Sequence, residues 1–510
     1  MSIDAESPPT ASVTTDRYFV RTFGCKANLY DSQLIESELQ QKGWHPAADE
    51  DHPDIRLFIV NSCTVTDEAD RQSRKSAERA GRRLKGARVL FTGCSAEANP
   101  EALKTLKGVN YIVGNREKPS LVSMALEALG KDRSDGLEPA SPRILGHVEG
   151  YDEMASRHPI DREWPLPDQL FEVPKILNNR RTRTFLKVQE GCDSFCTYCI
   201  IPYGRGPSRS LLIEGVTAKI RGLVESGTRE VILTGTNLGD YGRDWAGAPR
   251  IDELCEAILG DTGLERLRLT SLDPTEISPR LLSLMGSSPR LCAHFHVSLQ
   301  STQTKVLKLM KRKYGTEEVR SNLLAIDALA TRMGRPVFVG MDLITGFPGE
   351  TESDFQESVK FLEALPWSRL HVFPYSERTG TPATKIGGGI PFGERKERAR
   401  ELMRHSLRRM QAFYEKTLAW ASTQANGLTE VLLEGGAVKG PDGSYDWMVG
   451  HSREYLRVLL ALEGRDPATL KNETVSVRPK RLHVDAAASE VSLVCFSAES
   501  PRTRSPTRYS

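Results

Sequence analysis

The sequence predicts an α/β protein made of a doubly wound parallel sheet, a partial (βα)6 barrel and a small C-terminal β-barrel. Strand and helix patterns alternate with short connections over residues 17–130, and six further strand–helix pairs follow over residues 181–425. Such alternation is typical of parallel sheets covered by helices. Over residues 426–486 the pattern changes to short apolar runs separated by Gly, Asp and Asn, which is typical of small barrels that bind oligonucleotides.

The first domain, residues 17–130, is expected to contain four parallel strands, at residues 18–24, 55–61, 87–93 and 109–113. We expect one helix at 31–43, closed by glycine, and a long basic helix at about 71–86. Residues 1–16 and 131–180 lack hydrophobic periodicity, which predicts a disordered tail and a linker.

The second domain is expected to contain six barrel strands, at residues 185–189, 230–234, 266–270, 294–299, 337–344 and 370–375. Barrel enzymes carry their active sites at the C-terminal ends of such strands. A long charged helix at about 392–425 leads into the β-rich region. The Ser-, Arg- and Pro-rich residues 487–510 are predicted to form a disordered tail.

Composition narrows the class of protein. Of the 510 residues, 39% are hydrophobic and 27% charged, and the net charge of +2 identifies no partner. No apolar run reaches the ~18–20 residues of a membrane helix, and the N-terminus lacks the features of a secretory signal. We therefore expect a cytoplasmic protein that makes no use of a membrane. Its nine cysteines then serve in metal binding, redox chemistry or cores rather than in disulfides.

Three closely spaced cysteines follow the first barrel strand. Cys192, Cys196 and Cys199 stand in the run Gly-Cys-Asp-Ser-Phe-Cys-Thr-Tyr-Cys, with no fourth cysteine nearby. A [4Fe-4S] cubane normally takes four thiolates, so three leave one iron open to a substrate or cofactor. The alternative is a zinc knuckle, which would require a fourth Cys or His at short spacing, whereas His158 and His294 are distant in sequence.

A second set of three cysteines is spread over the first domain. Cys25, Cys63 and Cys94 each lie at or directly after the end of one of its first three strands. Parallel strands end at one edge of a sheet, where ligand sites form, so we expect these thiols to hold a second cluster. Three unrelated buried cysteines are the alternative. No function is assigned to the remaining three, Cys255, Cys292 and Cys495.

The run that ends in Tyr198-Cys199 resembles the cluster motif of the radical S-adenosylmethionine (SAM) superfamily. This resemblance implies that SAM binds the open iron and is cleaved to a 5′-deoxyadenosyl radical, while the protein supplies position and excludes water. Taken together, residues 18–486 resemble the methylthiotransferase family. That family implies two [4Fe-4S] clusters, SAM as cofactor and an RNA-binding TRAM domain at 426–486. It also implies a tRNA substrate and an electron donor such as flavodoxin or ferredoxin.

The family's SAM site lies at the ends of the barrel strands, and no catalytic side chain is expected beyond the cluster ligands. The matching residues of this chain are Tyr198, Gly235, Thr236, Asn237, Ser298, Asp342 and Phe373. A glycine in such a place lets the backbone approach a ligand closely. Ordinary turn chemistry is the alternative for each of these positions.

Three short stretches are most similar to one branch of the family, namely residues 24–32 (GCKANLYDS), 61–66 (NSCTVT) and 196–203 (CTYCIIPY). That branch converts N6-threonylcarbamoyladenosine next to the tRNA anticodon to its 2-methylthio derivative. The alternatives are family members that act on isopentenyladenosine in tRNA or on a ribosomal-protein aspartate. A more distant alternative is a non-catalytic iron–sulfur or zinc protein that binds RNA.

Basic and aromatic side chains mark expected RNA contacts, with solvated charged faces as the alternative. Around the barrel mouth these are Arg180, Arg181, Arg183, Lys187, Arg205, Arg209, Lys305, Lys308, Lys311, Arg312 and Lys313. In the β domain they are Lys471, Arg478, Lys480, Arg481 and His483, with Tyr445, Trp447 and Tyr455 for base stacking. Removal of the chain after residue 427 is accordingly expected to weaken tRNA binding and to leave SAM cleavage nearly unchanged.

Overall fold

The computed structural model describes residues 16–98, 103–135, 141–146, 148, 164, 182–425, 427–496 and 498–499. The chain forms two compact units, the first made of residues 1–150 and 174–177 and the second of residues 151–173 and 178–510. Residues 1–15 of the predicted N-terminal tail and most of the predicted linker lie outside the described residues. No helix within the described part of the chain is long and apolar enough to cross a membrane.

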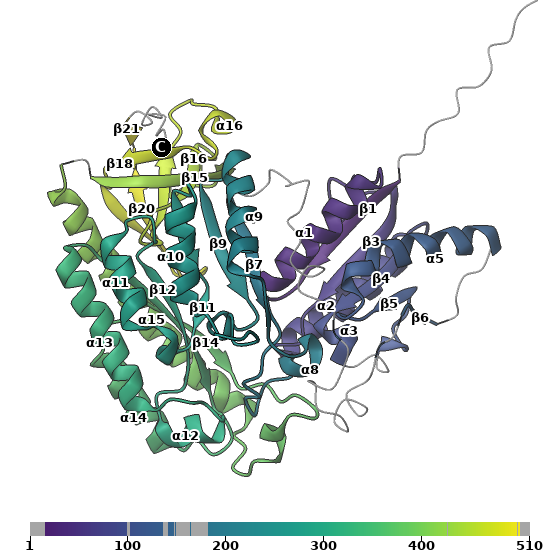
Figure 1. The fold of residues 1–510 in the computed structure, drawn as a ribbon, viewed down its shortest axis with the longest axis horizontal. Coiled ribbons are helices and arrows are strands. Elements are labelled where there is room, and N and C mark those ends of the chain that lie inside the picture. Colours follow the sequence, from purple (N-terminus) through teal and green to yellow (C-terminus); the bar gives the residue numbers. More distant parts are fainter. Residues whose placement is uncertain are drawn as a thin grey trace, which may run out of the picture. The chain divides into compact units, whose positions relative to one another are not determined.

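The first unit is a six-stranded parallel sheet with helices on both faces (Figure 1). Its strands lie in the order β2 (His45–Pro46), β1 (Arg17–Thr22), β3 (Ile55–Ser62), β4 (Arg88–Gly93), β5 (Tyr111–Val113) and β6 (Arg143–Ile144). Because the order reverses between β1 and β3, the sheet is doubly wound, as predicted, and a ligand site is expected at this reversal.

Alternate residues of β3 explain how both faces of this sheet are covered. Leu57 and Ile59 pack with α1 (Lys26–Gln41) and α5 (Leu121–Asp135), whereas Phe58 and Val60 pack with α2 (Asp67–Arg83). Successive side chains of a strand point to opposite faces, so an unbroken apolar run such as β3 is suited to a sheet buried on both sides. The end of α5 and strand β6 lie within the predicted linker, so the first domain continues beyond residue 130.

The second unit begins with a partial barrel of six parallel strands, close to the predicted positions. They are β7 (Arg183–Glu190), β9 (Glu230–Gly235), β10 (Arg266–Leu269), β12 (His294–Gln300), β13 (Phe338–Thr345) and β14 (Arg369–Pro374). Short β11 (Ser271–Leu272) pairs with β12, and β8 (Arg209–Ser210) pairs antiparallel with the open edge of β7. Within the described residues β14 does not pair with β7, so the barrel stays open, as expected.

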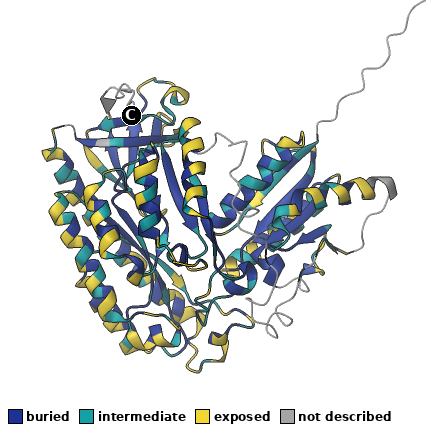
Figure 2. Ribbon diagram, in the orientation of Figure 1, coloured by how far each residue is buried: buried dark blue, intermediate teal, exposed yellow. Residues whose placement is uncertain are grey.

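Helices cover the outside of the barrel and connect its strands (Figure 1). The longer ones are α9 (Ile213–Glu225), α10 (Ile251–Asp261), α11 (Pro279–Ser287), α13 (Thr316–Met333) and α14 (Glu352–Glu363). Short turns of helix at the barrel mouth are α8 (Ile201–Arg205), η3 (Leu238–Asp240), η4 (Pro274–Glu276), α12 (Thr304–Leu309) and η5 (Pro382–Lys385). In Figure 2 the strands are mostly buried, whereas the outer sides of the helices are exposed.

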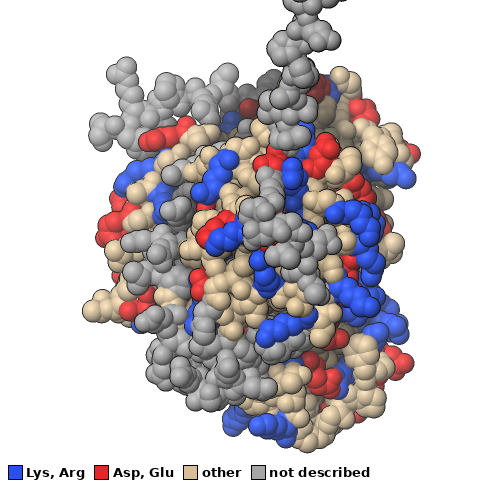
Figure 3. All heavy atoms as spheres, turned by 90° about the vertical axis from the view of Figure 1, so that its right-hand side faces the viewer, with Lys and Arg blue, Asp and Glu red and all other residues tan. Residues whose placement is uncertain are grey.

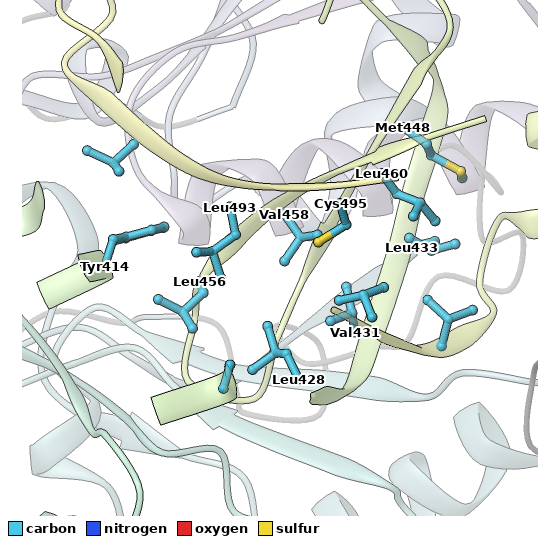
Figure 4. Close-up of a cluster of buried hydrophobic side chains, with 14 of the residues drawn as sticks. Tyr414, Leu428, Val431, Leu433, Met448, Leu456, Val458, Leu460, Leu493 and Cys495 are labelled. Atoms are coloured by element: carbon cyan, nitrogen blue, oxygen red, sulfur yellow. The ribbon is translucent and has the colours of Figure 1, made fainter. Parts of the chain in front are cut away.

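The long helix α15 (Phe392–Thr423) leads to a seven-stranded sheet. Its order is β19 (Arg481–Asp485), β20 (Glu490–Cys495), β17 (Arg457–Ala461), β16 (Trp447–His451), β15 (Leu428–Val438), β18 (Thr474–Val477) and β21 (Ala498–Glu499). Strand β20 lies inside the segment predicted to be a disordered tail, so residues 490–495 are a correction to that prediction. Cys495 is fully buried in the core of this sheet, beside Leu493 and Val458 (Figure 4).

The C-terminal sheet closes the N-terminal end of the barrel. Its apolar core includes Phe338 at the start of β13 and Tyr414 of α15. Beside this core, Glu230 at the start of β9 is fully buried between Arg266 (Nε–Oε2 2.7 Å) and Arg268 (Nε–Oε1 2.8 Å). The two guanidinium groups also donate to backbone oxygens of the sheet domain, at Glu430, His451, Ser452 and Arg453.

Candidate active site

The loop that carries Cys192, Cys196 and Cys199 starts with a sharp turn at the C-terminal end of β7. Gly191 has φ of +78°, and a Cβ there would lie 1.8 Å from the carbonyl oxygen of Pro207. Only glycine satisfies both conditions. The backbone N–H of Cys192 then donates to the carbonyl of Gly206 at 3.0 Å, which holds the first cysteine against α8.

The far end of the loop is fixed to two other loops at the barrel mouth. The Thr197 hydroxyl donates to the Leu309 carbonyl at 2.8 Å, and the N–H of Ala383 donates to the Thr197 carbonyl at 2.8 Å. Tyr198 packs edge-on against Phe347, with 6.2 Å between ring centroids. These contacts join the loop to segments more than a hundred residues away in sequence, so the positions of the thiols depend on the whole barrel.

The three thiols of this loop affect one another. Burial raises the pKa of Cys192 to about 11, and burial followed by the charges of Cys196 and Cys192 raises the pKa of Cys199. Burial therefore disfavours the thiolate form here, whereas a bound cluster or metal ion would favour it. No group of three His, Cys, Asp or Glu in the described ranges converges on one ion. Ligands of a [4Fe-4S] cubane need not converge on one ion, because each thiolate binds a different iron.

Two polar side chains reach the sulfur atoms. Arg312 donates to Cys196 Sγ at 3.2 Å, and Asn237 donates from Nδ2 to Cys192 Sγ at 3.7 Å. Arg312 also donates to the Ser298 carbonyl at 3.2 Å and forms an ion pair with Asp273. Hydrogen bonds to cluster sulfurs adjust the reduction potential of a cluster. Arg312 was expected in an RNA-facing run, so its burial beside the thiols corrects that prediction.

Carboxyl groups of low acidity lie beside this site. Burial raises the pKa of Asp240, which accepts a hydrogen bond from Asn237 Nδ2 at 2.8 Å. Burial raises the pKa of Asp273 as well, and burial together with the neighbouring Asp273 raises the pKa of Glu276 to about 7. Of the three carboxyl groups, Glu276 has a pKa close to neutral, so it loses its proton at a higher pH than a carboxyl group in water does.

The residues expected to bind SAM fall into two groups. Tyr198 belongs to the cysteine loop, Asn237 donates to Cys192 Sγ, and Ser298 is connected to the loop through Arg312. Gly235 and Thr236 lie at and directly after the end of β9. The Gly191 N–H donates to the Thr236 hydroxyl at 3.2 Å, and a Cβ on Gly235 would lie 2.8 Å from Gln189 Oε1.

Two other expected SAM contacts are not joined to the cysteine loop. Asp342 forms an ion pair with His296 (2.9 Å) deeper in the barrel, and Phe373 is 42% exposed at the end of β14. Neither has a hydrogen bond or ion pair to that loop among the described residues. A role of these two residues in SAM binding stays a prediction.

The other three cysteines meet at the C-terminal edge of the first sheet, where the strand order reverses. Cys25 caps α1, Cys63 follows β3 and Cys94 begins α3 (Cys94–Ala98). Gly24 has φ of +93°, and a Cβ there would lie 2.5 Å from Cys63 Sγ. A Cβ on Gly93 would lie 2.4 Å from the carbonyl oxygen of Ser62. The three cysteine loops are therefore in direct contact, as the strand positions predicted.

Asparagine side chains hold these loops together. Asn28 Nδ2 donates to the carbonyls of Phe23 and Ser62, both at 2.8 Å, and Asn61 Nδ2 donates to the Asn28 carbonyl at 2.9 Å. Asn115 donates to Cys94 Sγ at 3.5 Å. Asn28 and Asn61 stand within the two motifs quoted above, so the sequence marked both positions. Asn115 follows β5 in a loop that carries no such motif. The donor set of three thiols with N–H groups directed at sulfur fits an iron–sulfur cluster.

Several residues expected to contact RNA have other roles. Lys187 and Arg205 are buried and pair with Glu190, both at 2.5 Å. Arg183 pairs with Glu434 at 3.0 Å, inside the second unit. Tyr455 packs on His294 with 4.5 Å between ring centroids, and Trp447 is buried. Arg180 and Arg181 lie outside the described residues. The candidates that remain exposed are Lys305, which pairs with Asp354 at 2.9 Å, and Lys308, Lys311, Lys313, Tyr445, Arg478, Lys480 and Arg481.

Comparison with known proteins gives the class of enzyme. Residues 17–114 match the model of an uncharacterized protein family, UPF0004, and residues 186–362 match the radical SAM superfamily. The chain is 36% identical over 396 residues to the threonylcarbamoyladenosine tRNA methylthiotransferase MtaB of Aquifex aeolicus (strain VF5). The aligned region covers 78% of this chain and 89% of that protein.

The chain is also 30% identical over 401 residues to the tRNA-2-methylthio-N(6)-dimethylallyladenosine synthase of Koribacter versatilis (strain Ellin345). This aligned region covers 78% of the chain and 84% of that protein. Among solved structures it is similar to the radical SAM methyltransferase TsrM from Kitasatospora setae, at 17% identity and a TM-score of 0.48, over 72% of this chain and 75% of that one. The match to the radical SAM superfamily and the relatives' identities define a radical SAM enzyme. The chain belongs to the methylthiotransferase family of these enzymes.

Proposed function

We propose that this enzyme converts N6-threonylcarbamoyladenosine next to the tRNA anticodon to its 2-methylthio derivative, in the cytoplasm and with electrons from a flavodoxin or ferredoxin. The observation that carries the proposal is the identity of 36% and 32%, over 78% and 84% of the chain, to two relatives named as threonylcarbamoyladenosine tRNA methylthiotransferases. The identity to the dimethylallyladenosine synthase described above is lower, at 30%. The motif around Cys25 supports the same substrate.

We assign the two cysteine sets to two [4Fe-4S] clusters. Cys192, Cys196 and Cys199 would hold the cluster that leaves one iron open to SAM, whereas Cys25, Cys63 and Cys94 would hold the second cluster. Bound there, these groups supply the radical chemistry and the sulfur needed to functionalise an unactivated adenine carbon. The tasks of the chain's own residues are to position these groups and to exclude water.

Positioning and water exclusion can be read from the contacts of the second unit. Gly191 and Thr197 fix the two ends of the cysteine loop, and Asn237 and Arg312 direct N–H groups at its sulfurs. Tyr198 and Phe347 form an aromatic wall beside the loop. At the opposite end of the barrel, side chains at the starts of the strands, such as Phe338 and Glu230, are buried beside the C-terminal sheet.

The substrate assignment is tested by mass spectrometry of tRNA nucleosides from cells with and without the gene. We expect 2-methylthio-N6-threonylcarbamoyladenosine to disappear with the gene and to return on complementation. Loss of the 2-methylthio derivative of isopentenyladenosine, or loss of a ribosomal-protein modification with unchanged tRNA, would instead assign the enzyme to another branch of the family.

The ligand assignment is tested by metal analysis of the anaerobically reconstituted protein. Two cubanes require about eight irons per chain, and the variant C192A/C196A/C199A should retain about four and lose SAM cleavage. A matched control is the double variant C255A/C292A, which removes two buried thiols away from both sites and should keep all of the iron. Stoichiometric zinc with negligible iron would contradict the assignment.

A further inference from the structure

Helix α2 carries a row of positive charge that the active site does not use. Lys75, Arg79 and Arg82 are exposed and are spaced four and three residues apart, so they lie on one side of the helix. None of the three has an ion pair or a hydrogen bond within the described part of the chain. Arg71, one turn earlier, differs from them because it pairs with Glu68.

These three side chains line one wall of a hollow of about 570 Å³ in the first unit. Arg21 and Phe23, from β1 and the residues that follow it, lie on another wall, with the guanidinium 5.8 Å from the centre of the ring. The lining contains five basic side chains and two acidic ones, Glu50 and Glu78, so three positive charges are in excess. On the face shown in Figure 3, Lys and Arg side chains gather in a band along one side.

The chemistry of this hollow favours a polyanion with aromatic rings. From Lys75 to Arg82 the helix rises about 10 Å, enough to contact more than one phosphate of a chain. Phe23 offers a partly exposed ring on which a base can stack. The centre of a protein–protein interface is depleted of charge, whereas nucleic-acid interfaces are strongly positive. Phe23 also lies two residues before Cys25, so an RNA bound here would pass close to the second cysteine site.

We propose that this flank of α2, made of Lys75, Arg79 and Arg82 with Phe23, is a tRNA-binding surface of the first unit. The proposal rests on the proposed function, because it takes tRNA as the substrate. RNA contacts are then divided between the two units, and affinity for tRNA is not determined by the C-terminal sheet alone. Removing the three charges weakens binding without touching any residue of the cysteine sites.

The test is a tRNA-binding titration of the full-length anaerobic protein at a low and a high salt concentration. The variant K75Q/R79Q/R82Q should bind tRNA about tenfold or more weakly at low salt. Its plot of log affinity against log salt should be less steep by up to about 2.7, since each phosphate contact contributes about 0.9. Thermal melts and SAM cleavage without RNA should equal those of the wild type.

Two further variants make the result specific. K42Q/K107Q/K131Q removes the same charge from exposed lysines of the same unit that do not line the hollow, and it should bind tRNA nearly as the wild type does. K75R/R79K/R82K keeps the charges and should keep affinity. Equal tRNA affinity and equal salt dependence in the glutamine variant and the wild type would overturn the proposal.

A protein partner predicts a different pattern. If α2 docks an acidic electron donor, the glutamine variant should bind tRNA normally and lose activity with flavodoxin while keeping activity with a chemical reductant. That outcome would also overturn the proposal. The proposed function fails separately, namely if wild-type protein forms no 2-methylthio nucleoside in tRNA, whichever way the binding experiment comes out.

Discussion

Arg312 shows how a single side chain connects separate parts of the barrel. Its guanidinium contacts a thiol of the cysteine loop, the backbone of β12 and the carboxylate of Asp273. Breaking a buried ion pair leaves an uncompensated charge, which commonly costs about 3–5 kcal/mol. Because one of its partners is Cys196, a change at Arg312 also alters the surroundings of the cysteine loop that we assign to the SAM-binding cluster.

We therefore expect R312Q to lower the melting temperature and the rate of SAM cleavage together. The double variant R312Q/D273N should recover part of the stability, because the orphaned carboxylate is then gone. The exposed neighbour Lys313 gives the matched control. K313Q should change neither the melting temperature nor the rate of SAM cleavage. If R312Q melted like the wild type and only tRNA binding fell, Arg312 would be the RNA contact that the sequence predicted.

The raised pKa of Glu276 predicts a pH dependence of stability that the variant E276Q can assign to this carboxyl group. Its folded pKa of about 7 lies above the usual value near 4.5, first because of burial and then because of Asp273. The folded state therefore binds more protons than the unfolded state between these two values, and the contribution of Glu276 to stability is lost as the pH rises through that window. Thermal melts at pH 5.5 and pH 7.5 should show a smaller difference for E276Q than for the wild type. An equal difference in both proteins would show that Glu276 titrates normally.

The residues that the sequence identified are those whose signal is local. The six cysteines assigned above to the clusters stand in short motifs or at strand ends, and a strand end can be located from hydrophobic periodicity alone. Arg312 looked like one member of a basic run, because its partners Asp273 and Cys196 are 39 and 116 residues away in sequence. Lys187 and Arg205 were misassigned for the same reason, since their burial against Glu190 exists only in the folded barrel.

At the scale of elements, glycine turns decide whether the cysteine loops can meet. Gly24 is placed between β1 and Cys25 with φ of +93°, and a Cβ there would overlap Cys63. We expect G24A to lose the iron of the second cluster and the methylthiolated product, while SAM cleavage without RNA persists. Iron content and formation of 5′-deoxyadenosine measure the two effects separately.

Gly43 provides the control for this prediction. It also has a positive φ, +82°, but a Cβ there would meet nothing within 4 Å. G43A therefore carries the same kind of backbone strain without the contact at the cysteine site, and it should keep both clusters. If G24A and G43A behaved alike, backbone strain rather than contact with Cys63 would explain the loss.

Element boundaries were predicted well where apolar runs are long and poorly where they are short. All six barrel strands lie within a few residues of their predicted positions, because each is a stretch of regularly placed apolar residues between turn residues. Strand β20 was assigned to a disordered tail, because its short run is followed by a polar, Pro-containing segment. Its identity as a strand depends on pairing with β17, more than thirty residues earlier, and with β19.

At the scale of the whole molecule, the C-terminal sheet is joined to the barrel more closely than a separable RNA-binding module would be. Arg453 pairs with Glu430 within the sheet domain and donates to the carbonyls of Glu265 and Pro289 in the barrel at 2.9 and 2.8 Å. His294 and Phe338, at the starts of two barrel strands, pack on Tyr455. Loss of the sheet would expose this apolar surface to water together with the Glu230–Arg266–Arg268 cluster.

A chain that ends after α15 should therefore fail to fold normally, in contrast to the expectation drawn from the sequence. Burial of Phe338, Met410 and Tyr414 depends on side chains of the sheet, and buried arginines would lose backbone acceptors that no other segment replaces. We expect the truncated protein to aggregate or to melt well below the wild type, with SAM cleavage and tRNA binding lost together. To test RNA binding by the sheet without this damage, K480Q/R481Q changes two exposed charges and should weaken tRNA binding while melting and SAM cleavage stay unchanged. A soluble truncated protein with normal SAM cleavage would show that the barrel is stable without its C-terminal cover, and the buried arginines would then have to be satisfied by water.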